Sequence, residues 1–177
     1  MNAADRSAVP DQVRKKAQGI RLLVLDVDGV LTDGGLHFDD EGREHKVFHV
    51  LDGYGIRSLM DTGIEVAVIS GRNSLAVKAR LAELGLLHIY LGQDNKLVAL
   101  KKLVDTLQLP ATAVAYVGDD VPDQECMSHA GLAVAVADAH PNVVTTADWQ
   151  TSLGGGRGAV RQVCDLIMAS APGSADQ

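Results

Sequence analysis

The sequence predicts an α/β fold of the Rossmann-like kind, in which a central parallel sheet is flanked by helices. Short and nearly continuous apolar runs, such as residues 22–27, suit strands that are buried on both faces. These runs alternate with segments of helical periodicity, and polar or charged residues follow four of them. Because ligands of open α/β sheets bind outside the carboxyl ends of the strands, we expect these polar positions to form the functional site.

Length and composition limit the classes of protein to which this chain can belong. The chain has 177 residues, enough for one domain with a full core, and a formal net charge of -7, which disfavours nucleic acid or an anionic membrane as the main partner. An anionic substrate would therefore need a local cation. Cys126 and Cys164 lie in expected helices and provide no disulfide framework, and no apolar stretch is long enough to span a membrane. We expect a cytoplasmic protein.

The first 18 residues are polar and predict an N-terminal tail or a weak helix, ahead of a single domain over residues 19–170. The first strand then ends in two acids, Asp26 and Asp28. Side chains two positions apart on a strand share a face, and like charges this close repel unless a cation neutralises them. Mg²⁺, which prefers oxygen ligands, would do so. An acidic turn is the simpler alternative for Asp28, but it leaves Asp26 inside the apolar run unexplained.

A β-hairpin is expected over residues 33–52, projecting from the sheet just after the acid pair. Turn-forming residues at 39–42 separate its two short arms. The spacing of His37, His45 and His49 matches no zinc-binding pattern, so we interpret them as exposed hairpin residues.

The next helix is expected to begin at Asp52, acting as its N-cap, and to end at Gly63. Its buried residues would be Ile56, Leu59 and Met60.

A second strand over residues 65–69 ends in Ser70, Gly71 and Arg72, and a helix follows over about residues 74–84. A hydroxyl and a glycine at a strand end before a helix favour phosphate binding, because the hydroxyl and backbone N–H groups donate to the anion. A simple serine cap is the alternative. The helix is expected to bury Leu75, Leu81 and Leu84.

A third strand over residues 89–91 precedes a helix for which Asp94 is the expected N-cap. Lys96 lies in the first turn of that helix, where the macrodipole disfavours a cation. A bound phosphate would reverse this penalty, so we interpret Lys96 as a candidate phosphate ligand rather than a solvated lysine.

A fourth strand over residues 113–117 is followed by three acids, Asp119, Asp120 and Asp123. Acids are also common where a helix begins, so this group alone is ambiguous. However, four successive strand ends carry acids, a hydroxyl, a lysine and acids again, and that order is improbable by chance.

The rest of the chain predicts a fifth strand over residues 132–136, then a glycine-rich loop and a closing helix over residues 152–170. Glycines surround Arg157, so this stretch is either mobile or closely approached by other backbone. The last residues, 171–177, are expected to be disordered.

The string Asp-Val-Asp-Gly-Val-Leu-Thr-Asp at residues 26–33 resembles the nucleophile motif of the haloacid dehalogenase (HAD) superfamily of phosphotransferases. The other three strand ends match that superfamily in type and order, over roughly residues 21–137. The resemblance implies a HAD fold in which Asp26 is the nucleophile that forms an aspartyl-phosphate, and Asp28 is the acid and base.

The same resemblance implies the ligands of the site. Phosphate or substrate would be bound by Ser70, Gly71, Arg72 and Lys96. Mg²⁺ would be bound by Asp26, the backbone carbonyl of Asp28 and Asp119, with Asp120 and Asp123 as supporting acids.

Four longer strings narrow the resemblance. They are Asp-Gly-Tyr-Gly-Ile at residues 52–56, Tyr-Val-Gly-Asp-Asp at 116–120, Val-Ala-Asp-Ala-His-Pro at 136–141 and Gly-Gly-Arg-Gly-Ala-Val-Arg at 155–161. Together they are similar to the phosphatases of 3-deoxy-D-manno-octulosonate (KDO) 8-phosphate, a capless and tetrameric branch that serves lipopolysaccharide synthesis. The resemblance implies a Mg²⁺-dependent phosphatase for this sugar phosphate.

No insertion after Asp33 or Ser70 is long enough to form a cap domain. An open site would admit water and recognise little of the substrate. We therefore expect an oligomer in which neighbouring subunits cover the active sites, with the hairpin as a flap at the interface, and the resemblance implies that this oligomer is a homotetramer. The resemblance further implies that Arg157 binds the substrate's carboxylate or phosphate, which suits guanidinium geometry.

Three alternatives stay open. A phosphatase for another sugar acid, such as an N-acylneuraminate 9-phosphate, would use the same catalytic residues. A receiver domain of a response regulator also combines acids, Mg²⁺ and a lysine, but its phosphorylated aspartate ends the third strand, which here ends in Gly92 and Gln93. An inactive relative used for binding or regulation would lack a residue that the chemistry needs, whereas all of them are present.

Overall fold

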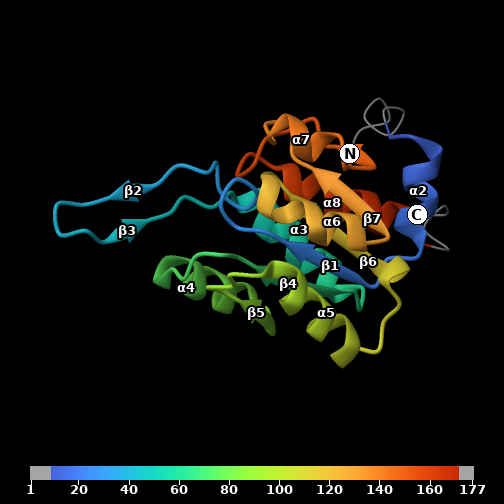
Figure 1. Cartoon of the computed structure of the whole chain (residues 1–177), viewed down its shortest axis with the longest axis horizontal. Coiled ribbons are helices and arrows are strands. Elements are labelled where there is room, and N and C mark those ends of the chain that lie inside the picture. The colour runs from blue at the N-terminus through green and yellow to red at the C-terminus, as the bar shows by residue number, and fades with distance from the viewer. Residues whose placement is uncertain (1–8, 172–177) are drawn as a thin grey trace.

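The computed structural model describes residues 9–171, which form an α/β domain with helices on both faces of one sheet (Figure 1). The sheet has six strands in the order β5-β4-β1-β6-β7-β8, and every neighbouring pair is parallel. The predicted parallel sheet is therefore confirmed. Its strands are β1 (Leu22–Leu25), β4 (Glu65–Ile69), β5 (His88–Tyr90), β6 (Val114–Gly118), β7 (Leu132–Ala135) and β8 (Trp149–Gln150).

The helices are α2 (Asp11–Gln18), α3 (Val50–Asp61), α4 (Leu75–Leu84), α5 (Lys96–Thr106), α6 (Gln124–His129), α7 (Pro141–Val144) and α8 (Ala159–Ser170). Two 3₁₀ turns, η1 (Ala111–Ala113) and η2 (Val121–Asp123), flank β6. Within residues 9–171, no helix has both the length and the apolar character needed to cross a bilayer.

The core lies on both faces of the sheet because successive strand residues point to opposite sides. Leu23 and Leu25 of β1 pack in a cluster with residues of α2, α3, α4 and α8. Leu22 and Val24 pack in a second cluster with residues of α5 and α6. Every residue of β1 is buried, as predicted for a strand in the middle of a parallel sheet. Cys126 and Cys164 are buried in α6 and α8, also as expected.

The predicted hairpin is present and projects from one end of the sheet (Figure 1). Its arms are β2 (His37–Phe38) and β3 (Glu44–His45), which pair antiparallel, with His37 opposite His45. Both of these histidines are exposed, as predicted. His49 is not: it is half-buried and caps α3, because its Nδ1 accepts a hydrogen bond from the Leu51 backbone N–H at 3.3 Å.

Of the two predictions for residues 1–18, a tail or a weak helix, the helix is confirmed for α2, but its burial was not expected. Val13 and Ala17, four residues apart, line one side of this short helix and are buried in the core, as is Val9 just before it. The helix packs against α8 and β7. Residues 1–8 and 172–177 lie outside the described part of the chain. The expected disorder of residues 171–177 therefore stays a prediction from residue 172 on.

Three local predictions are also wrong. Leu75 was expected to be buried but is 82% exposed, because the buried face of α4 is formed by Val77, Leu81 and Leu84, and Leu75 lies off that face. Asp94 does not cap α5; the Asn95 side chain does, accepting from the Val98 N–H at 3.0 Å. Asp52 does not cap α3 but is buried inside its first turn.

Candidate active site

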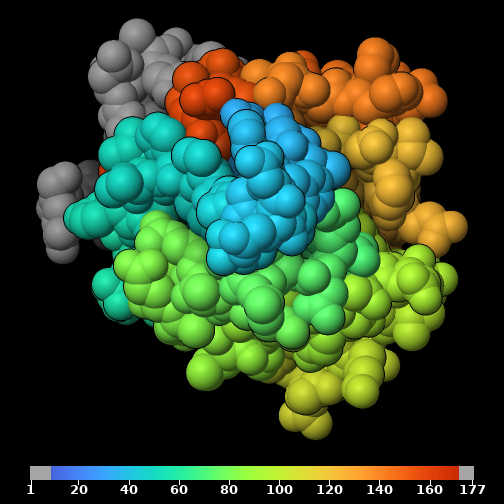
Figure 2. Space-filling model, turned by 90° about the vertical axis from the view of Figure 1, so that its left-hand side faces the viewer, coloured from blue at the N-terminus to red at the C-terminus, as the bar shows by residue number. Residues whose placement is uncertain are grey.

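A cavity of about 830 Å³ opens at the carboxyl ends of the strands. Figure 2 looks at this end of the molecule, where the hairpin stands in the centre of the face. The cavity brings together nine of the ten predicted site residues, which are Asp26, Asp28, Ser70, Gly71, Arg72, Lys96, Asp119, Asp120 and Asp123. They follow β1, β4, β5 and β6, so the parallel arrangement of the strands assembles the site.

Asp26 directly follows β1 and is 6% exposed. The Lys96 ammonium lies 3.0 Å from Asp26 Oδ1 and 2.8 Å from Asp123 Oδ1, so it forms ion pairs with both acids. Burial, and then the charge of Asp123, raise the pKa of Asp26 to about 7 against the opposing effect of Lys96. Lys96 is therefore a buried cation of the site and not a solvated lysine.

Asp119 directly follows β6 and lies near Asp26 and Asp123. Burial, and then the charges of Asp26 and Asp123, raise the pKa of Asp119 to about 8. Its Oδ1 is buried, and no group among residues 9–171 donates a hydrogen bond to it. Ligand oxygens of Asp26, Asp119 and Asp123 all lie within 4.8 Å of one another. A hard divalent cation fits this donor set, because it would satisfy the orphaned oxygen and neutralise the crowded carboxylates.

Asp123 is fully buried, and both of its carboxylate oxygens have partners. The Tyr116 hydroxyl donates to Oδ1 at 2.8 Å, and the backbone N–H groups of Asp119 and Asp120 donate to Oδ2 at 3.1 and 3.4 Å. Asp120 in turn caps η2 through the Val121 N–H. These contacts fix the loop that carries Asp119, which is consistent with the supporting role predicted for Asp120 and Asp123.

Gly29 lets the loop after β1 approach Asp119 closely. Its φ is +90°, and a Cβ at this position would lie 2.0 Å from Asp119 Oδ2. A side chain at residue 29 would therefore collide with one of the clustered acids, in addition to straining the backbone.

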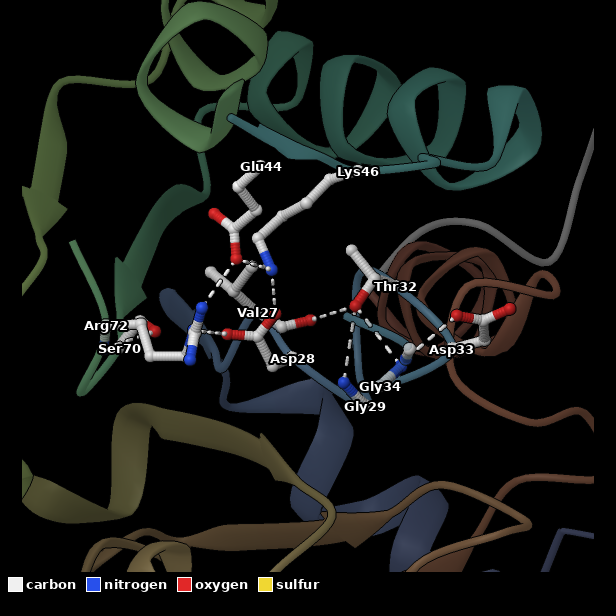
Figure 3. A network of polar contacts seen from close by, with 11 residues as sticks. Val27, Asp28, Gly29, Thr32, Asp33, Gly34, Glu44, Lys46, Ser70 and Arg72 are labelled. Atoms are coloured by element: carbon white, nitrogen blue, oxygen red, sulfur yellow. Dashed lines mark hydrogen bonds and ion pairs between the residues drawn. The ribbon is translucent and has the colours of Figure 1, made fainter. Parts of the chain in front are cut away.

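The Asp28 carboxylate contacts Lys46 of the hairpin on one side and Arg72 on the other (Figure 3). Its Oδ1 accepts a hydrogen bond from the Lys46 ammonium, and its Oδ2 lies 3.5 Å from Arg72 Nε. Glu44 Oε1 completes the network, at 3.2 Å from Lys46 Nζ and 2.6 Å from Arg72 Nη2. Lys46 and Glu44 come from the hairpin and were missed by the sequence analysis, since nothing in a short polar hairpin arm indicates that it folds back onto β1.

Ser70 is 3% exposed at the end of β4, where its Oγ accepts a hydrogen bond from the Arg72 N–H at 3.3 Å. The helix that follows begins at Leu75, so Ser70, Gly71 and Arg72 form a loop at the cavity wall rather than a helix N-terminus. All three residues line the cavity, although the Ser70 N–H donates to the Tyr90 carbonyl and the Arg72 N–H to Ser70 Oγ.

Arg157 is the one predicted site residue that does not line this cavity. Its Nη2 donates to Asp33 Oδ2 at 3.0 Å on the protein surface. The glycine-rich segment is closely approached, one of the two predicted outcomes: the Gly156 N–H donates to the Val30 carbonyl at 2.9 Å. A Cβ on Gly155 would lie only 1.8 Å from the carbonyl oxygen of Gly29.

Several known proteins are similar to this chain in sequence. Residues 82–154 match the family model described as haloacid dehalogenase-like hydrolase. Among curated proteins, the chain is similar to the 3-deoxy-D-manno-octulosonate 8-phosphate phosphatase of Salmonella typhi, with 52% identity over 160 residues, covering 90% of this chain and 85% of that protein. The phosphatase of the same name from Yersinia pestis is 50% identical over 160 residues, which are 90% of this chain and 86% of that one.

Solved structures of phosphatases with the same name are also similar to this chain. The crystal structure of the Yersinia pestis phosphatase has a TM-score of 0.91 and 48% identity to this chain, covering 94% of it and 90% of that chain. The phosphatase of Moraxella catarrhalis, solved in complex with magnesium, phosphate and KDO, has a TM-score of 0.90 and 40% identity, covering 93% of this chain and 94% of that one.

Proposed function

Because this chain belongs to the family of 3-deoxy-D-manno-octulosonate (KDO) 8-phosphate phosphatases within the haloacid dehalogenase-like hydrolases, we propose that it hydrolyses KDO 8-phosphate to KDO and inorganic phosphate with Mg²⁺. The observation that carries this function is the meeting of Asp26, Asp119 and Lys96 in one cavity, with Asp28 two residues after Asp26. The Moraxella catarrhalis relative, whose structure contains magnesium, phosphate and KDO, supports both the cofactor and the substrate.

In the first step, an oxygen of the Asp26 carboxylate attacks phosphorus. The new bond joins Asp26 to the phosphoryl group, and the bond from phosphorus to the sugar oxygen breaks as Asp28 gives that oxygen a proton. In the second step, Asp28 takes a proton from water, which attacks the phosphoryl group and returns Asp26 to a free carboxylate. Splitting hydrolysis in this way replaces one difficult displacement by two easier ones.

Lys96 keeps the nucleophile oriented, since its ammonium pairs with Asp26 Oδ1 and is itself held by Asp123. Asp26, Asp119 and the backbone carbonyl of Asp28 would hold Mg²⁺, which screens the repulsion between the carboxylate and the anionic phosphate. Ser70, Gly71 and Arg72 would bind the phosphoryl oxygens together with Lys96, and Asp120 and Asp123 would support the site.

We further propose a cytoplasmic homotetramer in which a neighbouring subunit covers each cavity. The cavity is open, and the hairpin over it exposes apolar side chains: Leu36 is 50%, Phe38 57% and Val47 70% exposed. Apolar exposure of this kind is typical of an interface. Arg157 would then contact the substrate in one of two ways. Either the glycine-rich segment moves, or Arg157 reaches the active site of a neighbouring subunit.

The function is tested by phosphate release from KDO 8-phosphate and a panel of other sugar phosphates, with Mg²⁺ and with chelator. We expect selective, Mg²⁺-dependent release that falls at least about 10³-fold in Asp26→Asn, because the nucleophile is lost. Asp61→Asn removes an exposed carboxylate at the end of α3 and should leave the rate unchanged. Selective release from an N-acylneuraminate 9-phosphate would keep the mechanism and reject the substrate.

A further inference from the structure

The hairpin supplies a buried cation to the site of its own chain. The Lys46 side chain is 1% exposed, although it belongs to a projecting hairpin whose other cation, Arg43, is 68% exposed. A buried ammonium is unfavourable unless carboxylates compensate it. Lys46 has two such partners, Asp28 and Glu44.

The contacts of Asp28 define the direction of its carboxylate. One oxygen accepts from Lys46 and the other faces Arg72, so rotation of the carboxylate would break an ion pair on either side. Each carboxylate oxygen has two acceptor sites, which leaves capacity for a further hydrogen bond to a reacting group.

Glu44 holds both cations in place, through contacts of 3.2 Å to Lys46 and 2.6 Å to Arg72. The network joins two acids, Asp28 and Glu44, to two cations, so its formal charges balance and the Asp28 side chain is fixed (Figure 3). Glu44 is also largely covered, with 14% of its side chain exposed, which indicates a built arrangement and not a chance surface pair.

From this geometry we infer that Lys46, held by Glu44, is a positioning residue for proton transfer by Asp28. The inference rests on the acid and base role of Asp28 in the proposed function. Lys46 acts through Asp28 and does not itself exchange a proton. The hairpin is thus a working part of the site in its own chain, in addition to any cover that it gives a neighbour.

Leaving-group dependence tests this role. Lys46→Met keeps the length of the side chain and removes its charge. The measured quantity is kcat/KM for 4-nitrophenyl phosphate, phenyl phosphate and glycerol phosphate. This quantity reports the steps up to release of the alcohol. A nitrophenolate leaves without a proton, whereas an alkoxide requires one. We expect kcat/KM to fall about 10²-fold for glycerol phosphate, within the usual contribution of proton transfer, and about threefold or less for 4-nitrophenyl phosphate.

Three further variants complete the test. Lys46→Arg keeps a cation and should restore most of the activity on glycerol phosphate. Glu44→Gln should change the leaving-group dependence in the same direction as Lys46→Met, because it frees Lys46. Arg43→Met removes a cation of the same hairpin whose partners are Asp39 and Glu41, and it should change neither rate.

A double-mutant cycle separates positioning from other roles. In an Asp28→Asn background, Lys46→Met should add no further leaving-group dependence, since the group that it positions is absent. An equal loss on all three phosphates, a raised KM with unchanged leaving-group dependence, or no loss at all would each overturn the inference. Because none of these probes is a sugar acid, a different natural substrate would refute the proposed specificity without affecting this test.

Discussion

Buried carboxylates set the properties of this site at the scale of single residues. Asp26 is buried and Asp119 is half-buried beside it. Burial raises both pKa values, and so do neighbouring carboxylates, which are Asp123 for Asp26 and both Asp26 and Asp123 for Asp119. Lys96 compensates part of this repulsion at Asp26, whereas Asp119 keeps an oxygen without a protein partner. The folded chain therefore carries an unfavourable charge arrangement that a divalent cation would relieve.

This arrangement predicts how stability depends on pH in the metal-free protein. The pKa values of Asp26 and Asp119 are raised to about 7 and about 8, above the value of about 4 for an unfolded aspartate. Between about pH 4 and about pH 8 the folded state therefore binds more protons than the unfolded state. The free energy of unfolding should consequently fall as the pH rises from about 4 to about 8, by up to about 1.4 kcal/mol per pH unit for each extra proton.

Urea denaturation with chelator, at several pH values, measures this effect. Asp119→Asn should flatten the fall, because it removes one of the two groups with a raised pKa. Added Mg²⁺ should stabilise the wild type more at pH 8 than at pH 5, since it competes with protons for the same oxygens. Identical pH profiles for wild type and Asp119→Asn would contradict this account.

Among the helices, strands and loops, the features that could be predicted from the sequence are those that depend on neighbouring residues in the chain. The polar residues at the ends of β1, β4 and β6 were predictable as a set, because each alone has a structural alternative but their order over successive strand ends is improbable by chance. The burial of α2 was not, because eight polar-looking residues become a core helix only through contact with α8. Asp52 illustrates the same limit: it looked like a local cap, but it accepts hydrogen bonds from the Gly158 and Arg161 N–H groups, more than 100 residues later.

Lys46 was missed for a related reason. Its partner Asp28 lies 18 residues away, and only the path of the hairpin brings them together. The role of Arg157 stays a prediction, because its motif gives residue type without direction and its side chain pairs with Asp33 in this chain.

The contact between the glycine-rich segment and the loop after β1 predicts a strong effect of Gly155→Ala. The added Cβ would meet the Gly29 carbonyl oxygen at 1.8 Å, and backbone cannot yield as a flexible side chain does. We expect a loss of about 1–3 kcal/mol in unfolding free energy, together with lower kcat, because the displaced loop carries Asp28.

Gly19→Ala is the matched control for this change. Residue 19 has a φ of -90°, and the nearest atom to an added Cβ is 3.8 Å away, so alanine fits there. Denaturant unfolding and steady-state kinetics of both variants give the comparison. Equal behaviour of the two would show that the segment does not support the site.

At the scale of the whole molecule, the chain encloses its cavity incompletely. No cap domain follows β1 or β4 within residues 9–171; the loop between β4 and α4 is only five residues long, and the hairpin is the one projection from this face (Figure 1). The same hairpin exposes Leu36, Phe38 and Val47. A small open enzyme with an apolar projection gains both cover and stability by assembling with copies of itself.

Phe38→Asp should weaken this assembly. A carboxylate in an apolar interface loses hydration without gaining a partner, so the variant should sediment as smaller species than the wild type. Leu87→Asp places the same charge on a residue that is 85% exposed away from the hairpin, and it should sediment like wild type. Sedimentation velocity at matched concentrations measures both, and a wild type that is already monomeric would reject the tetramer.

The order of the strands has a consequence for how the chain acquires activity as it folds. β1, which carries Asp26, lies between β4 and β6, and its pairing with Val114–Gly118 joins segments about 90 residues apart. Such non-local pairing forms slowly, because the intervening chain must lose its freedom before any contact compensates for it. A chain still emerging from the ribosome has no β6 to complete the site until two thirds of it has been synthesised. Recovery of activity during refolding would therefore report the docking of the sheet's central strands and not an early local event.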